Sequence, residues 1–393
     1  MTFTKIITTL ALGISCSVLW AQDGYQMKPN SDEIEADFLT NYYQQDGNNS
    51  PVTGGIGTEQ LTDFSTMIVV NIPLDSTKSI NASFGADIYS SASTDNIDNN
   101  RSSASSQDSR KYANVGFYKK KLAKGQTYGV KAGFSKEYDY TSFSGGVSFT
   151  KEFNQGNSEL SFNGQAFIDS WQLIYPIELR GRVDVASSAR RSYNAQLTFS
   201  QVLTKRLQFS VSAEAIYMEG LLSTPFHRVY FSDQNLPDIE RLPNSRLKLP
   251  FSLRLNYMPT DFLIFRSYYR YYTDDFGITG HTASLEVPIK LNNVFTIAPY
   301  YRYHTQTAAD YFAPYQVHTS AEEFYTSDYD LSTLVSQKIG LGVKYAPIYG
   351  LGRAKLGKKL MTLKYLQLRG ASYTRDTGLN AWSISLDLGI GIK

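Results

Sequence analysis

The 393-residue chain has little cysteine and little charge. Its single cysteine, Cys16, lies within the first apolar segment, so the remainder can form neither a disulfide nor a thiolate metal site. Charged residues make up 19% of the chain and balance to a formal net charge of +2. A chain this close to neutral has no bulk electrostatic reason to bind nucleic acid, and we expect no nucleic-acid partner.

Long apolar runs are missing after the first twenty or so residues. Lys5, the apolar stretch Ile6–Trp20 and the small residue Ala21 have the order of a secretory signal peptide. The apolar stretch is shorter than the roughly 20 residues of a spanning helix. We therefore predict a signal peptide over 1–21, a periplasmic N-terminal segment over 22–35 and a mature chain without transmembrane helices.

The rest of the chain alternates strictly between apolar and polar residues, with the period of a β-strand. Similar alternation runs through 80–88, 207–217 and 382–392. In the segment 246–258 the apolar positions are Leu247, Leu249, Phe251, Leu253, Leu255 and Tyr257, and the polar positions are Arg246, Lys248, Pro250, Ser252, Arg254 and Asn256.

Three features favour a membrane barrel over a secreted β-sandwich, propeller or β-helix. The alternating segments run to about twelve residues or more, whereas soluble strands usually have about 5–6. The 29 tyrosines and 22 phenylalanines cluster near segment ends, as in interfacial aromatic girdles. Short and long connections also take turns along the chain. We predict an all-β fold, a transmembrane antiparallel up-and-down β-barrel over 36–393, in the cell outer membrane.

The number of strands follows from closure. Fifteen clear segments lie between Thr58 and Lys393, and the first and last run in the same direction. Because bacterial barrels normally have an even number of strands, one more is needed upstream, and Ala36–Gln44 is the candidate. We predict sixteen strands, with fourteen as the alternative. Sixteen strands can surround a water-filled lumen.

Several stretches resemble an uncharacterised family of outer-membrane β-barrels of Bacteroidota, known as a domain of unknown function. They are YYQQDGNNSPVTGGIGTEQLTD (42–63), GADIYSSAS (85–93), SSASSQDSRKYANVGF (102–117), AGFSKEYDYTSFSGG (132–146) and STPFHRVYF (223–231). The resemblance spans almost the whole mature chain and implies an outer-membrane barrel without implying a reaction. The chain ends in Ile392-Lys393, whereas many barrels end in an aromatic residue that the assembly machinery reads.

The alternation also predicts which charges face the lumen, because polar side chains face inward in a lipid-embedded barrel. Five consecutive strands together carry a row of inward basic residues, which we call the basic wall, and Glu286 is the one acid identified among the inward positions of these strands. The N-terminal half of the barrel is less charged, with Asp87, Lys131 and Glu214 facing inward. The basic wall comprises Arg246, Lys248, Arg254, Arg266, Arg270, Lys290, Arg302, Lys338 and Lys344, joined by His304 when it is protonated.

A basic wall inside a low-dielectric shell concentrates anions and repels cations. We therefore predict a channel or transporter for small, anionic solutes. The alternative is that acids of infolded loops, within 233–240 and 310–330, neutralise the wall. The barrel would then be a non-conducting surface-binding, scaffold or assembly-partner protein. The expected partners are outer-membrane lipids, lipopolysaccharide and the barrel assembly machinery.

Signals for chemistry are weak, and neither a cofactor nor enzymatic activity is expected. A hydrolase-type barrel enzyme would use His227 or His318, with Asp233 and Asp310 near in sequence. Thr53–Gly57 (TGGIG) lacks the lysine of a phosphate loop and predicts a turn with unusual backbone angles. Oxygen-rich predicted outer loops give incomplete candidates for Ca²⁺ ligands, namely Asp46, Asn48, Asp95 and Asp98.

Overall fold

The computed structural model describes residues 33–90, 107–176 and 187–393. The signal peptide predicted over 1–21, nearly all of the segment predicted over 22–35, and Asp95 and Asp98 lie outside these residues. In the described parts of the chain no helix is long and apolar enough to cross a membrane. The helices there are short 3-10 turns: η2 (Pro51–Thr53), η3 (Leu122–Lys124), η4 (Asn154–Gly156) and η6 (Tyr329–Leu331).

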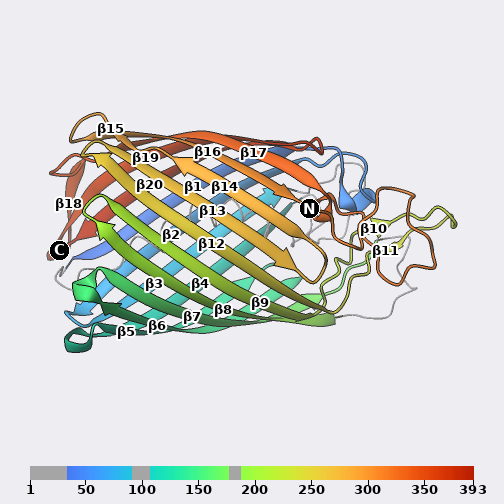
Figure 1. The fold of residues 1–393 in the computed structure, drawn as a ribbon, viewed down its shortest axis with the longest axis horizontal. Coiled ribbons are helices and arrows are strands. Elements are labelled where there is room, and N and C mark those ends of the chain that lie inside the picture. Colours follow the sequence, from blue (N-terminus) through green and yellow to red (C-terminus); the bar gives the residue numbers. More distant parts are fainter. Residues whose placement is uncertain (1–32, 91–106, 177–186) are drawn as a thin grey trace.

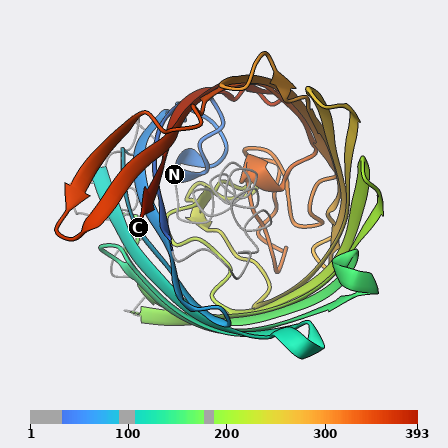
Figure 2. The ribbon, with the colours of Figure 1, turned by 90° about the vertical axis from the view of Figure 1, so that its left-hand side faces the viewer.

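One antiparallel sheet closes on itself to form a barrel of sixteen strands, which confirms the predicted fold class (Figures 1 and 2). Eighteen elements fill sixteen positions, because β14 and β15 share one position and β17 and β18 share another. The elements are β1 (Ile34–Asp46), β2 (Leu61–Asp75), β3 (Lys78–Ser90), β4 (Gln107–Lys121), β5 (Gln126–Lys136), β6 (Tyr140–Phe153), β7 (Ser158–Gln172), β8 (Ser187–Thr204), β9 (Leu207–Gly220), β12 (Ser245–Thr260), β13 (Leu263–Asp274), β14 (Thr279–Glu286), β15 (Ile289–Lys290), β16 (Phe295–Gln306), β17 (Leu334–Tyr345), β18 (Gly352–Leu356), β19 (Lys359–Arg375) and β20 (Asn380–Ile392).

The strand that closes the ring is the one inferred from parity. The candidate Ala36–Gln44 lies within β1, which pairs antiparallel with β2 on one side and with β20 on the other. Its register with β20 runs without interruption from Ile34 opposite Ile392 to Asp46 opposite Asn380. The sixteen-strand prediction is confirmed, and the alternative of fourteen is wrong.

The two faces of the strands differ as the alternation predicts. On β12, Leu253 is 46% exposed and Leu255 is 39% exposed, whereas the intervening Arg254 is only partly exposed. Large exposed apolar side chains at alternating positions recur on strands all round the barrel. The outer surface is therefore an apolar belt, and the polar side chains project into the interior.

The two ends of the barrel differ in their connections. At the turn end, tight turns join the strands, and β20 ends there. At the loop end lie the long connections, and one of them carries the short strands β10 (Arg228–Val229) and β11 (Asp238–Ile239) (Figure 1). Part of the connection after β17 is folded, because β18 pairs with the start of β19 and forms a hairpin that flares outside the ring at the turn end (Figure 2).

Candidate functional site

The predicted basic wall lies on consecutive barrel strands. On β12, Arg246, Lys248 and Arg254 alternate with the exposed apolar side chains of the outer face. The register between β12 and β13 places Arg254 opposite Tyr268, on the same face as Arg270. The remaining members of the predicted wall are distributed as Arg266 on β13, Lys290 on β15, Arg302 on β16, and Lys338 and Lys344 on β17.

Two further arginines extend this wall onto β19 and were missed by the sequence prediction. Arg369 lies 4.8 Å from the ring centroid of Tyr300, an inward residue of β16. Arg375 ends β19, and its Nη1 lies 2.7 Å from Oδ1 of Asp330. A bulge between Leu363 and Tyr365 shifts the alternation of this strand. The regular run from Gln367 to Arg375 was the sequence signal that could have revealed both arginines.

Carboxylates from the strands neutralise part of the basic wall. Arg246 pairs with Asp274 at the end of β13, with Nε donating to Oδ2 at 3.0 Å. Glu286, 4% exposed, accepts from Arg266 at 3.3 Å and lies 3.0 Å from Arg369. The ion pair between Arg369 and Glu286 joins β19 to β14, although two strand positions lie between these strands. Both side chains therefore reach into the interior of the barrel. Of the loop acids that were expected to neutralise the wall, Asp330 pairs with Arg375, an arginine outside the predicted set.

Opposite the basic wall, the loop end of β2–β7 carries buried acids that the prediction underestimated. Glu137 lies just beyond β5, accepts from the Tyr89 hydroxyl at 2.6 Å and is 3.9 Å from Arg110. Burial raises the pKa of Glu137 to about 9, against the lowering effect of Tyr89 and Arg110, so this acid is neutral at pH 7. The other acids of this group, each 5% exposed or less, are Asp63, Asp87, Asp108, Asp139 and Asp169.

Connections 47–60, 221–244 and 307–333 meet at the loop end and form what we call the loop cap. Figure 2 shows segments of all three across the opening of the ring. Arg228 donates to the carbonyl of Val52 at 2.6 Å, and a two-way backbone bridge joins Arg241 to Tyr325. The predicted turn in TGGIG is confirmed, because all three of its glycines have φ between 78° and 89°. These contacts bind the three connections into one unit.

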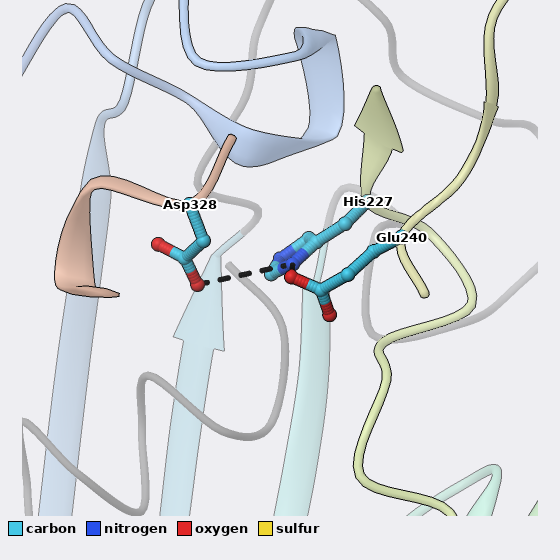
Figure 3. A group of neighbouring side chains, drawn as sticks. All are labelled: His227, Glu240 and Asp328. Carbon is cyan, nitrogen blue, oxygen red and sulfur yellow. Dashed lines mark hydrogen bonds and ion pairs between the residues drawn. The ribbon is translucent and has the colours of Figure 1, made fainter. Parts of the chain in front are cut away.

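His227, Glu240 and Asp328 meet inside the loop cap (Figure 3). Nδ1 of His227 lies 3.2 Å from Oε1 of Glu240 and 3.8 Å from Oδ2 of Asp328. The side chains are 2%, 2% and 7% exposed, respectively. Burial by itself raises the pKa of Glu240, but His227 and hydrogen bonds from Thr326 and the backbone of Thr224 outweigh it, and the pKa lies below its ordinary value.

The residues singled out for hydrolase chemistry and for Ca²⁺ have other contacts. Asp233 accepts from Ser320, His318 contacts Glu322, and His227 contacts Glu240 and Asp328. Asp46 accepts from Gln60 at 3.2 Å. Over 33–90, 107–176 and 187–393, the only group of three or more His, Cys, Asp or Glu residues whose ligand atoms all lie within 4.8 Å of one another is that of His227, Glu240 and Asp328, which we call the His227 cluster. Asp46 is not a member of this cluster.

Comparisons with known proteins identify a family but no activity. The family model described as "Protein of unknown function (DUF3570)" matches residues 10–351. No curated protein sequence matches the chain significantly.

Solved structures that resemble the chain share little sequence identity with it. A "Bacterial polysaccharide outer membrane secretin" has 10% identity and a TM-score of 0.47, over 90% of this chain and 97% of that one. The siderophore receptor PirA from Acinetobacter baumannii has 12% identity and a TM-score of 0.44, over 88% of this chain but only 53% of the receptor. The TodX monoaromatic hydrocarbon channel has 11% identity and a TM-score of 0.36, over 92% and 88%.

Proposed function

Because the chain belongs to the DUF3570 family of proteins of unknown function, its family supplies no activity, and we propose from the geometry that it is an outer-membrane barrel whose lumen admits small anionic solutes. The observation that carries the proposal is the row of inward arginines and lysines on consecutive strand positions from β12 to β19.

The membrane location is supported by the outer surface. An apolar belt of this extent is unfavourable in water, and lipid acyl chains would cover it. The uninterrupted barrel strands have 11 to 18 residues, against the roughly 9–11 that a tilted strand needs to cross a bilayer. Closure leaves no unpaired strand edge in the hydrocarbon. With the predicted signal peptide, these features support the outer membrane, with the loop cap on the outer side.

The preference for anions is supported by the balance of charge inside the barrel. Along the strands that carry the basic wall, the inward cationic side chains outnumber the inward acids Asp274 and Glu286. On the opposite wall, Arg110 and Arg190 compensate part of the group of buried acids. Cationic side chains inside a low-dielectric shell raise the local concentration of anions.

The loop cap favours a second candidate function. Because contacts between three connections hold it across the loop end, the barrel could be a non-conducting protein that binds partners at the cell surface. In this function the basic wall would stabilise the closed barrel and would not select solutes.

Planar-bilayer recordings of the refolded barrel in a KCl gradient test the first function. A reversal potential that indicates chloride preference is expected, and replacing Arg254 and Arg302 with glutamine should reduce it. Lys111→Gln is the matched control, since Lys111 lies on the outward-facing positions of β4 and should not affect selectivity. Cation selectivity would overturn the proposal, and a folded barrel that is electrically silent would favour the second candidate.

A further inference from the structure

We propose that His227, Glu240 and Asp328 bind one divalent transition-metal ion, with the properties of Zn²⁺, which fastens the loop cap. The proposal is independent of whether the lumen conducts, because it rests on the loop cap alone. His227 and Glu240 belong to connection 221–244, and Asp328 belongs to connection 307–333 (Figure 3). An ion held by all three would therefore join two loops that are distant in sequence.

The spacing of the three ligand atoms fits a small cation. Zn²⁺ binds nitrogen and oxygen at about 2.0–2.2 Å in tetrahedral geometry, which separates neighbouring ligand atoms by roughly 3.3–3.6 Å. The observed separations from Nδ1 of His227 are 3.2 and 3.8 Å, and all three ligand atoms lie within 4.8 Å of one another. Small side-chain adjustments would place an ion between them.

The surroundings already orient both carboxylates. Oε2 of Glu240 accepts from the backbone N–H of Thr224 at 2.7 Å, and its Oε1 accepts from the Thr326 hydroxyl at 2.6 Å. Oδ1 of Asp328 accepts from the backbone N–H of Asp330 at 2.9 Å, and its Oδ2 lies 3.8 Å from Nδ1 of His227. Hydrogen bonds of this kind commonly fix the ligands of metal sites and raise their affinity.

The charge of the cluster also favours a divalent ion. Two carboxylates and one imidazole are nearly excluded from water. The two carboxylates carry the negative charge of this group, and a bound divalent ion would compensate it. Buried charges are stable only when they are compensated and hydrogen-bonded. Imidazole with carboxylate ligands suits Zn²⁺ and other first-row metals.

Metal titration of the refolded barrel in detergent, stripped first with a chelator, tests the proposal. Calorimetry and elemental analysis should give about one Zn²⁺ per chain, and Co²⁺ should give the visible absorption of a tetrahedral nitrogen–oxygen site. His227→Ala and the conservative Asp328→Asn should each weaken Zn²⁺ binding by about 100-fold or more. Zn²⁺ should also slow hydrogen exchange in 223–242 and 325–330 of the wild-type protein.

Two controls separate the cluster from other ligands. His281→Ala removes an exposed histidine of β14 that contacts Tyr269, and Asp233→Asn removes an exposed acid of the loop cap. Both should bind Zn²⁺ as the wild type does. Heat-dependent migration in gels shows whether each variant has folded. The absence of stoichiometric Zn²⁺ binding in the folded wild type would overturn the proposal, and so would unchanged binding by folded Asp328→Asn.

Discussion

Replacing Val147 with arginine is expected to destabilise the barrel far more than the same replacement at Ser148. The two residues are neighbours near the middle of β6 (Tyr140–Phe153) and face opposite sides of the sheet. Val147 is 55% exposed on the apolar belt, and Ser148 faces the interior, opposite Gly129 and Asn163. The pair tests both the membrane location and the face assignment while strand, depth and introduced side chain are kept the same.

The magnitude follows from the depth of the site. Val147 lies six residues or more from either end of β6, about 20 Å of strand on each side. A tilt of about 45° turns this into roughly 14 Å of depth, close to the midplane of a hydrocarbon core about 30 Å thick. An arginine on the lipid face at the midplane costs about 2–4 kcal/mol. In the lumen, Ser148→Arg meets polar neighbours and should cost less than about 1 kcal/mol.

Equilibrium unfolding in guanidinium chloride, with the barrel folded into lipid vesicles, measures both effects. Tryptophan fluorescence reports the transition, since Trp171 and Trp382 lie in β7 and β20. Equal destabilisation by the two variants, or a larger loss for Ser148→Arg, would refute the face assignment of this strand. A loss below about 1 kcal/mol for Val147→Arg would refute the membrane location of the belt.

Three further perturbations test contacts at other points of the barrel. Glu286→Gln removes the shared partner of Arg266 and Arg369, which are about one-third exposed, and should lower the free energy of unfolding by about 1–3 kcal/mol. Gly277→Ala should lower it by about 1–2 kcal/mol, because φ is +85° in the turn after β13. Burial raises the pKa of Glu322, but hydrogen bonds to its carboxylate lower it below the ordinary 4.5. Its contribution to the loop cap should therefore persist above pH 4.5 and disappear as the pH falls through the lowered value, which hydrogen-exchange protection of 318–323 would report.

Matched variants accompany these three tests. Glu219→Gln breaks the exposed pair with Arg191 and should change stability by less than about 1 kcal/mol. Gly352→Ala adds a methyl group where no atom lies within 4 Å, and it should be nearly neutral. Glu322→Gln should remove the pH dependence of protection over 318–323. If Glu286→Gln costs no more than Glu219→Gln, the interior ion pairs contribute little to stability.

The barrel could be predicted from sequence because period-two alternation is a local property. Each strand contributes its own evidence, and parity supplied the strand at Ala36–Gln44 that local evidence left weak. Arg369 and Arg375 were not predicted as inward residues, because the bulge at Leu363 and Tyr365 shifts the inward and outward positions of β19 by one residue. Apart from Asp87, the acids of the opposite wall were not predicted, because many of them, such as Asp63 and Glu137, lie near or beyond strand ends, where alternation gives way to turns.

The His227 cluster had no comparable signal. Its members lie on connections without periodicity, and His227 and Asp328 are brought together only when two long loops pack at the same end of the barrel. His227 was noticed as a histidine in an outer loop, but of the two aspartates near the loop histidines in sequence, Asp233 accepts a hydrogen bond from Ser320. Sequence distance between loop residues fixes no geometry, so a site of this type emerges only from the packing of the loop cap.

Asp330 contacts both the extension of the basic wall onto β19 and the His227 cluster. A single substitution at Asp330 therefore separates the proposed anion preference of the lumen from the proposed Zn²⁺ site. Its carboxylate pairs with Arg375, 7% exposed, at 2.7 Å, whereas its backbone N–H holds Asp328. Asp330→Asn should cost about 3 kcal/mol, because it leaves the Arg375 charge buried and unpaired. The uncompensated charge should increase chloride preference in bilayer recordings, while Zn²⁺ binding remains, because the backbone donor to Asp328 is unchanged. Loss of Zn²⁺ binding without a change in selectivity would contradict this division of roles, since the side chain of Asp330 would then act on the cluster and not on the lumen.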